Sequence, residues 1–457
     1  MKYISYPFIP KRTHIITIGI RIVILLLSGI PLAVYPQEKA LPAQWDLQAC
    51  IDYALENNIR IKQSEANKET GLVDTKQAKA AMLPSLSASV GQNLTNYPFS
   101  KEDDSSGTSS FSASGSYNLN ASWTLFDGGS RSTGIKQAEL NNRIADLEID
   151  ESKNNIKLAI IQNYMQILYA SEALKAYEDA VKLSKAQLES NKIKLSVGSV
   201  AKSDVSQWES QYASDNYNLV NAGTTLENYK LQLKQLLELD GLDSMELVLT
   251  PPDEDAVLFL IPDKRTIYQT ALHVMPQVGN SQLNTEYAQL GVEKAKAGFY
   301  PTISLQANTG TGNLYNNSGY SFGSQLKNNW NNMVGLSVSI PIFSNRSVKS
   351  AVEKANINVY SSQLNELSIR KELYAEIETT YLNTVTSQSQ YVAAEEKVKY
   401  SRESYDVMNE QFTLGLKNTI EMLTEKNRLI TAQQELLQAK YTALMNIKLL
   451  EYYQGLI

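Results

Sequence analysis

Large apolar residues recur every three or four positions along a very long stretch of the chain, from about 130 to 239. Between Arg131 and Leu195 there is no proline and a single glycine, Gly134, and good helix formers dominate. Some 65 residues at a rise of 1.5 Å each would form a rod of roughly 100 Å. A bend at Gly198 then predicts a helical hairpin over 130–239. It contains no run of about 20 apolar residues, the length that a membrane helix needs.

The same pattern occurs twice. Matching residues lie 217 positions apart without a gap (415 − 198 = 217). The chain is therefore predicted to contain two copies of one unit, 45–240 and 262–457, joined by a linker at 241–261. The second copy predicts a second long hairpin over 346–454. The matching pairs include Pro84 and Pro301, Phe126 and Phe343, Gly198 and Gly415, and Asp204 and Glu421.

Each unit also contains two segments in which apolar and small polar residues alternate. This period of two predicts strands at about 85–94 and 112–126 in the first unit, and at about 302–310 and 333–343 in the second. The intervening segments 98–110 and 310–332 are rich in Gly, Asn and Ser and are predicted to be external loops. The apolar positions are Leu86, Ala88, Val90, Tyr117, Leu119, Trp123, Ile303, Leu305, Ala307, Val334, Leu336, Val338, Ile340 and Ile342.

Such strands fit either a soluble sandwich or a membrane barrel. Their polar face carries Ser, Asn and Gly rather than charges, and they are long enough to span a bilayer when tilted, which favours the barrel. Four strands cannot close a barrel, so three chains are predicted to supply twelve strands together. Aromatic residues near the strand ends suit a bilayer interface: Tyr97, Phe99, Phe111, Phe126, Tyr315, Phe322, Trp330 and Phe343.

Composition excludes several classes of function. The net charge of −6 over 457 residues gives no reason to expect a nucleic-acid partner. One cysteine, Cys50, and two histidines, His14 and His273, leave no intrachain disulfide framework and remove most metal sites. There is no nucleophile elbow, P-loop or dinucleotide fingerprint, so we predict no catalytic residues, no cofactor and no enzyme activity.

The N-terminus resembles a secretory signal peptide over residues 1–36. Lys11 and Arg12 precede a mostly apolar run from Ile15 to Leu27, which Arg21 interrupts, and cleavage is predicted between 33 and 37. A retained membrane anchor is the alternative.

In this order and register, several short motifs together resemble the TolC family of outer-membrane efflux proteins. The family implies a mainly α fold with a membrane β-barrel, in which three chains form an α-helical barrel and a twelve-stranded β-barrel. It further implies a homotrimer in outer membrane lipid, a periplasmic adaptor protein and an inner-membrane pump of the RND or ABC type. The motifs are Ala80-Ala81-Met82-Leu83-Pro84, Leu125-Phe126-Asp127-Gly128-Gly129, Pro341-Ile342-Phe343-Ser344, Leu195-Ser196-Val197-Gly198 and Phe412-Thr413-Leu414-Gly415.

The two hairpin turns carry the candidate functional residues. Gly198 and Gly415 predict the turns, and the resemblance places adaptor contact beside them, at Val197 and Leu414. The resemblance assigns a periplasmic gate to Asp204, Phe412, Lys417 and Glu421. Our hypothesis for its mechanism is that Asp204–Lys417 links between neighbouring hairpins hold the tip closed and that adaptor docking breaks them. A ring of Glu421 carboxylates would then favour cations.

This sequence departs from the family's gate at two positions. Phe412 lacks the hydroxyl of a tyrosine, and the second acidic ring position is Thr424, with Glu425 one residue along. A plain alternative also stands, because acids in the first turn of a helix complement its dipole.

The predicted function is an outer-membrane exit duct for an efflux or type I secretion system. A trimeric coiled-coil surface protein or adhesin stalk is the alternative from another class, and a soluble helical scaffold is a third. A stalk would show sustained heptads and no internal strands. The sequence leaves the cargo open among drugs, metal ions, siderophores and polypeptides.

Overall fold

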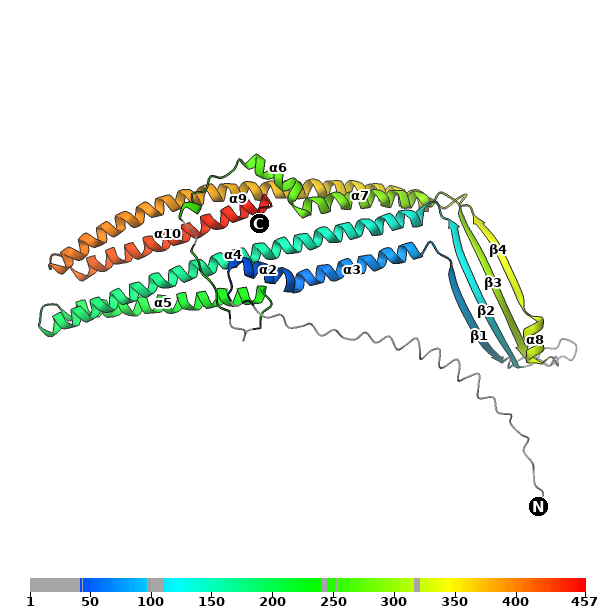
Figure 1. Ribbon diagram of the computed structural model, residues 1–457, viewed down its shortest axis with the longest axis horizontal. Helices are drawn as coiled ribbons and strands as arrows, with labels where there is room; N and C mark the ends of the chain where they lie inside the picture. The colour runs from blue at the N-terminus through cyan, green and yellow to red at the C-terminus, as the bar shows by residue number, and fades with distance from the viewer. Residues whose placement is uncertain are drawn as a thin grey trace, which may run out of the picture. The chain divides into compact units, whose positions relative to one another are not determined.

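The computed structural model describes residues 42, 44–96, 98, 111–240, 245–251, 254–315 and 321–457 (Figure 1). Residues 44–457 form one compact unit, which contains all the helices and strands reported below. The predicted signal peptide 1–36, the aromatics Tyr97 and Phe99, and nearly all of the predicted loop 98–110 lie outside the described residues.

Both copies of the repeat fold into the same series of long helices and strands, and the second copy has helix α8 in addition. The two longest helices, α4 and α9, have 67 residues each, and the helices that return from them, α5 and α10, have 35 each. The first copy comprises α2 (Leu47–Asn57), α3 (Ile59–Ala80), β1 (Ser85–Asn96), β2 (Phe111–Phe126), α4 (Ser130–Ser196) and α5 (Lys202–Leu236). The second comprises α6 (Lys264–Val274), α7 (Pro276–Ala297), β3 (Thr302–Tyr315), α8 (Phe322–Asn328), β4 (Asn331–Ser339), α9 (Ser347–Thr413) and α10 (Thr419–Tyr453), and a short 3-10 helix, Glu254–Ala256, lies in the linker.

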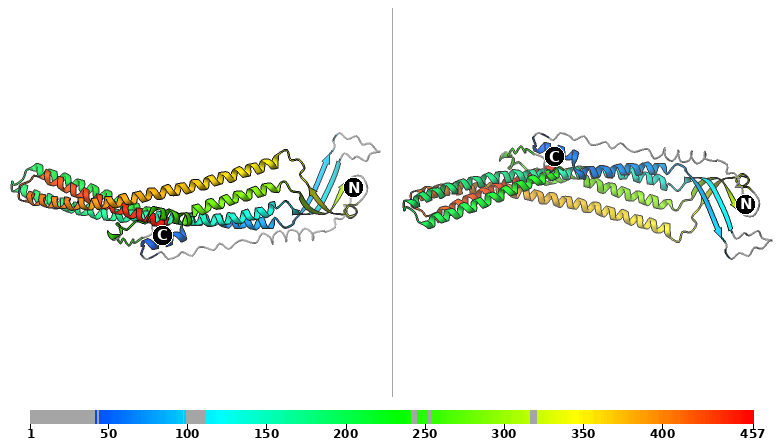
Figure 2. Two further views of the ribbon diagram at one scale, coloured as in Figure 1. Left: turned by 90° about the horizontal axis from the view of Figure 1, so that it is seen from above. Right: turned by 90° about the horizontal axis from the view of Figure 1, so that it is seen from below.

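The long helices form four parallel rows (Figures 1 and 2). Helix α4 packs on α3 and α5 on one side and on α7 and α10 on the other, and α9 packs on α7 and α10. Helices α5 and α3 meet end to end, because Asn58 Nδ2 donates to Leu236 O at 3.1 Å and Glu238 accepts from Ile59 N at 3.3 Å. Since α3 begins where α5 ends, the two helices act as one row.

The four strands form one antiparallel sheet in the order β1-β2-β3-β4. The register places apolar residues opposite one another, as in Ala88 with Leu119 and Leu305 with Leu336. Leu86, Val90 and Val334 on the same face are at least 70% exposed in the single chain. A sheet with one fully exposed apolar face needs a non-aqueous neighbour.

Two strand boundaries differ from the sequence prediction. Strand β3 continues to Tyr315, and β4 ends at Ser339, so the predicted strand positions Ile340 and Ile342 lie outside it. Pro341 explains the early end, because proline has no N–H for the ladder and restricts the residue before it. The predicted loop 310–332 instead contains the end of β3 and helix α8, which is held by Asn329 donating to Gly312 O at 2.6 Å.

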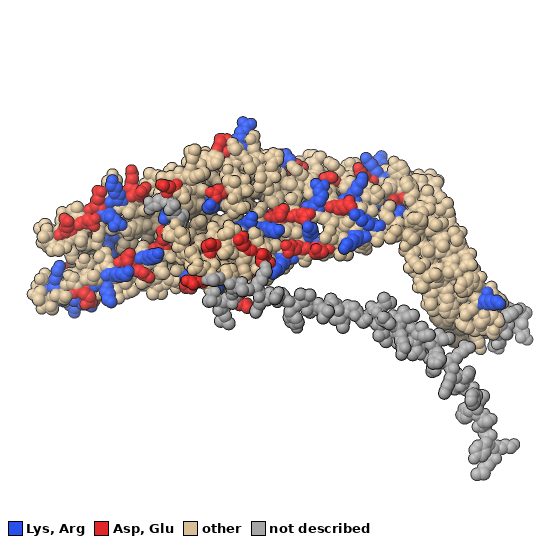
Figure 3. All heavy atoms as spheres, viewed as in Figure 1, with Lys and Arg blue, Asp and Glu red and all other residues tan. Residues whose placement is uncertain are grey.

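None of the four strands contains Asp, Glu, Lys or Arg, whereas the helices carry many of both signs (Figure 3). Helix α8, which lies at the end of the sheet away from the long helices (Figure 1), contains the charged residue Lys327. Among the described helices, none combines the length and the apolar composition needed to cross a membrane.

The main apolar core lies half-way along the rows, where α2 and the linker cover α4. Ile160, Tyr164 and Leu168 of α4 are buried there together with Trp45 and Cys50. Burial raises the pKa of the Cys50 thiol to about 12, so the cysteine is an inert core residue.

Candidate functional site

The two hairpin turns lie at the same end of the helical rows (Figure 1). Gly198 and Gly415 adopt φ values of +76° and +77°, and each N–H bonds back to a carbonyl of the preceding helix, Leu195 O at 2.9 Å and Phe412 O at 3.1 Å. A glycine adopts this left-handed conformation without steric penalty. Beside them Val197 and Leu414 are each 74% exposed, so both tips present an uncovered apolar side chain.

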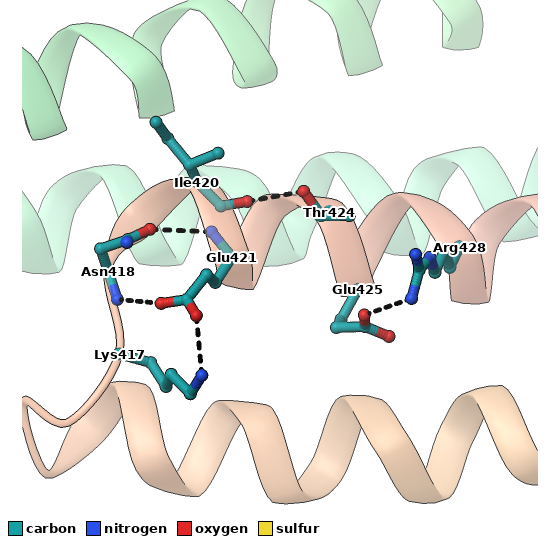
Figure 4. Close-up of polar contacts among 7 residues, drawn as sticks. All are labelled: Lys417, Asn418, Ile420, Glu421, Thr424, Glu425 and Arg428. Carbon is teal, nitrogen blue, oxygen red and sulfur yellow. Dashed lines mark hydrogen bonds and ion pairs between the residues drawn. The ribbon is translucent and has the colours of Figure 1, made fainter.

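Asp204 and Glu421, the two predicted acids, cap the first turns of α5 and α10. Asp204 Oδ2 accepts from Ala201 N at 3.1 Å, and Glu421 Oε2 accepts from Asn418 N at 3.1 Å (Figure 4). Asn418 Oδ1 accepts from Glu421 N in return, at 2.9 Å. This reciprocal arrangement is a capping box, so the helix-capping role of the acids is present in both repeats.

One of these acids also connects the two hairpins. The second oxygen of Asp204 accepts from the hydroxyl of Thr419 at 2.9 Å, and Thr419 is the buried first residue of α10. The connection runs from the first repeat to the second, at the tip itself. Sequence reasoning missed Thr419, because a threonine at the start of a helix gives no signal beyond its place in the turn.

Lys417 has a different partner from the predicted one. Within the described chain its ammonium lies 2.7 Å from Glu421 Oε1, four residues along, and the predicted link to Asp204 is not formed inside one chain (Figure 4). The hydrogen bond from Lys417, aided by that from the Asn418 backbone, lowers the pKa of Glu421 below its ordinary 4.5. The carboxylate therefore stays ionised over a wider pH range.

Phe412 packs inside an apolar cluster between the hairpins. The ring centre of Phe412 lies 6.4 Å from that of Trp208. The Lys194 ammonium lies 5.7 Å from the centre of the Phe412 ring. Trp208 is fully buried and belongs to this cluster with Val205 and Met422. A phenylalanine therefore contributes apolar and cation–π contacts at the tip in place of a hydroxyl bond.

At the family's second acidic ring position, Thr424 and the adjacent Glu425 do not present a free carboxylate. Thr424 donates to Ile420 O in its own helix at 2.8 Å, and Glu425 is largely buried (Figure 4). Glu425 accepts from Arg428 at 2.7 Å and from Ser404 of α9 at 3.1 Å. The carboxylate of Glu425 is therefore bound by residues of its own hairpin.

A family model described as outer membrane efflux protein matches residues 50–238 and 267–451, one match in each repeat. The chain belongs to the outer membrane efflux protein family. Among curated relatives, outer membrane protein TolC of Escherichia coli (strain K12) is 25% identical over 400 residues, which cover 85% of this chain and 78% of that protein. The proteases secretion protein PrtF of Dickeya chrysanthemi is 20% identical over 443 residues, covering 95% of this chain and 91% of PrtF.

Solved structures of other efflux channels share the fold. The outer membrane channel CmeC of Campylobacter jejuni superposes with a TM-score of 0.76 at 19% identity, covering 90% of this chain and 85% of that one. CusC superposes with a TM-score of 0.77 at 16% identity, covering 92% and 95%. The predicted family, the mainly α fold with a strand-based barrel and the outer-membrane location are thereby confirmed, as is an exit duct over a stalk.

The structure of this outer membrane efflux protein also contains a buried ion pair that the sequence did not predict. Lys426 of α10 pairs with Asp215 of α5, and their side chains are 1% and 4% exposed. Burial lowers the pKa of Lys426, against the opposing effect of Asp215. The sequence did contain one signal for this pair. The matching positions in the other repeat are Glu209 and Ala432, which cannot form an ion pair, so Lys426 and Asp215 depart from the internal repeat.

Metal binding has no support in the described part of the chain. Among the described residues, no group of three or more His, Cys, Asp or Glu side chains is placed to hold a metal ion. The acids at the tips are engaged by backbone N–H groups, Thr419 and Lys417.

Proposed function

We propose that three copies of this chain form one exit duct. Its helical tips would dock on a periplasmic adaptor that connects it to an inner-membrane pump of the RND or ABC type. Cargo then passes through the duct without energy input from this chain. The observation that carries the proposal is an uncharged four-stranded sheet whose two outer edges, β1 and β4, have no strand beside them in the described chain.

Unpaired strand edges support the trimer. In lipid each unsatisfied backbone group costs several kcal/mol, so an open sheet of four strands is not viable there. Pairing β4 of one chain with β1 of the next satisfies both edges, and three chains give a closed barrel of twelve strands, within the known range of eight upward.

The helical rows support the same assembly. The outer rows are α3 with α5 on one side and α9 on the other, and each carries large apolar residues that remain exposed in one chain. Those of α9 recur at steps of three, four, seven and eight residues, which is the spacing of a helix-packing seam. They are Ile357, Tyr360, Leu364, Leu367, Tyr374, Leu382, Val385 and Val392; Tyr217, Val220 and Leu231 of α5 are exposed in the opposite row.

The tips would form the gate of this duct. Asp204 holds the start of α10 through Thr419, so the two hairpins of one chain are fastened together at the entrance. Lys417 and Glu421 supply one charge of each sign beside it, and adaptor docking at Val197 and Leu414 would pull the hairpins apart. In the closed trimer, Lys417 would exchange Glu421 for Asp204 of a neighbouring hairpin.

Planar-bilayer conductance of the purified protein tests both parts of the proposal. We expect small, cation-selective wild-type channels that widen in the Asp204→Ala, Lys417→Ala double variant. Thr419→Val should widen them as well, whereas the matched control Thr431→Val should not, because the Thr431 hydroxyl donates to Asn427 O of its own helix. Absence of any channel would refute the duct, and unchanged conductance in both gate variants would refute the gate.

A further inference from the structure

Three cavities form a continuous band across the middle of the helical rows. The first, of about 620 Å³, lies where α4 meets the junction of α5 and α3; the second, of about 320 Å³, lies between α4 and α10; the third, of about 500 Å³, lies between α9 and α10. Gln166 lines the first and second cavities, and Gln438 and Thr442 line the second and third. The band therefore crosses all four rows.

Carboxamide side chains dominate this band. Helix α4 supplies Asn155, Gln162, Asn163 and Gln166. Further carboxamides come from the other rows, namely Gln232 of α5, Gln438 of α10 and Gln390 of α9.

The charged residues of the band are balanced. Lys397 and Glu435 in the third cavity form an ion pair with each other, and the first cavity contains one charge of each sign, Arg60 and Glu238. The band consequently offers many hydrogen-bond donors and acceptors with no net charge.

One buried carboxamide of the band has an oxygen that receives no donor from the described chain. Asn163 is 5% exposed and donates through Nδ2 to Gln232 Oε1 at 3.2 Å. Its Oδ1 has no donor among the described residues, which is unusual for a buried amide oxygen. The same side chain lines the first cavity.

The band opens on the face of α4 that α2 does not cover. Ile160, Tyr164 and Leu168 face the core under α2 and the linker. At 100° per residue, Ala159, Gln162 and Gln166 point to the opposite side of the helix. In the proposed trimer the layer of α2 and the linker must lie outside the ring, because three copies of it inside would fill the duct. The band then faces the lumen, and the inference rests on the proposed function in this respect.

We propose that this carboxamide band binds the main chain of unfolded polypeptide cargo inside the duct. Each peptide group carries one donor and one acceptor, and a carboxamide offers the same pair in one plane. Such bonds replace bonds to water at little net gain, so binding is weak enough to permit release, as conduction requires. In the second cavity Met165, Met445, Tyr169 and Tyr441 add adaptable apolar surface that suits varied side chains better than it suits a sugar.

Current blockade in planar bilayers tests this binding zone. The probe is an uncharged, unstructured peptide of Gly, Ser and Asn, and we expect it to interrupt the wild-type current for measurable dwell times. Gln166→Leu combined with Gln438→Leu removes two hydrogen-bonding groups at nearly constant volume and should shorten the dwell time about tenfold. The matched control is Gln363→Leu, which removes an exposed carboxamide of α9 that lines none of the three cavities.

Each result has a separate meaning. A wild-type protein that gives no conductance would overturn the duct itself. A conducting channel whose peptide dwell time is the same in the double variant as in wild type would overturn the band as a binding zone. A neutral maltooligosaccharide of similar mass serves as a second probe. If the double variant shortens its dwell time as much as that of the peptide, the assignment to polypeptide is wrong.

Discussion

The buried pair of Asp215 and Lys426 fastens the two hairpins to each other below the tips, and its removal should loosen them. The pair joins α5 of the first repeat to α10 of the second, and the other oxygen of Asp215 accepts from Gln211 at 2.8 Å. Lys426→Met keeps most of the side-chain volume but leaves a buried carboxylate with only the neutral Gln211 donor that the structure shows.

The expected magnitude follows from burial. With side chains 1% and 4% exposed, the pair is fully desolvated, and removing one partner of such a pair costs about 3–5 kcal/mol. Replacing both partners, Asp215→Leu with Lys426→Met, should be neutral or even stabilising by about 1–4 kcal/mol. The lowered pKa of Lys426 agrees with this sign, because it means that burial destabilises the ammonium more than Asp215 stabilises it. Stability should accordingly rise as the pH increases from that lowered value towards 10.5, since the unfolded chain then binds the proton more readily.

Amide hydrogen exchange of the detergent-solubilised protein, read by mass spectrometry, measures this loosening locally. Peptides from α5 and α10 should exchange roughly 100-fold faster or more in Lys426→Met, and at the wild-type rate or more slowly in the double variant. Peptides from the strands should not change. Lys182→Met is the matched control, because its ion pair with Asp179 is exposed at the surface of α4.

Two results would refute the reasoning. Wild-type exchange rates in Lys426→Met would mean that the pair does not hold the hairpins together. Equally fast exchange in the single and double variants would mean that lost volume or shape, and not an unpaired buried charge, causes the change.

Three further predictions concern the tip and the junction of strand and helix. Because Lys417 lowers the pKa of Glu421, cation selectivity due to Glu421 should persist at pH 4.5 and above and be lost only as the pH falls through that lowered pKa. Reversal potentials measured against pH would give the midpoint of this loss, and Lys417→Met should move the midpoint to higher pH. Gly198→Val should destabilise the turn by about 1–2 kcal/mol through backbone strain alone, since an added Cβ meets open space, and exchange of tip peptides would reveal it. Arg131 bonds to Asp127 at 2.9 Å and to two backbone carbonyls, so Arg131→Lys should cost about 1–3 kcal/mol of folding stability. It should therefore lower the temperature at which the proposed trimer dissociates on a gel, and an unchanged temperature would contradict this role.

The cargo inference and the gate are independent of each other. The carboxamide band lies half-way along the rows, where α5 ends at Leu236, whereas the residues of the proposed gate lie at the turns near 198 and 415. A duct with a different gate could still hold peptide at the band, and a duct without peptide binding could still open at Thr419. The two sets of variants therefore test separate parts of the molecule.

Local pattern in the sequence was sufficient for the long helices, the four strands and their duplication, but it missed helix α8 and the early end of β4. The spacing of 217 residues identified two copies, periods of two and of three to four distinguished strands from helices, and Gly198 and Gly415 marked the turns. These features depend on residues close together in the chain, so the sequence displays them directly. The sequence also implied several chains, because four strands leave two open edges.

Tertiary structure alone decided which side chains meet. Asp204 bonds to Thr419 and Asp215 pairs with Lys426 because the hairpins come side by side at a particular rotation and height. A shift of one residue along α10 would turn each of its side chains by about 100° and change every such partner. The repeat cannot supply this information, since contacts between the two copies join positions that do not match each other. Periodicity determined which residues form helices and strands, and only the packing of one copy against the other determined the fastening at the tips and the carboxamide band across the rows.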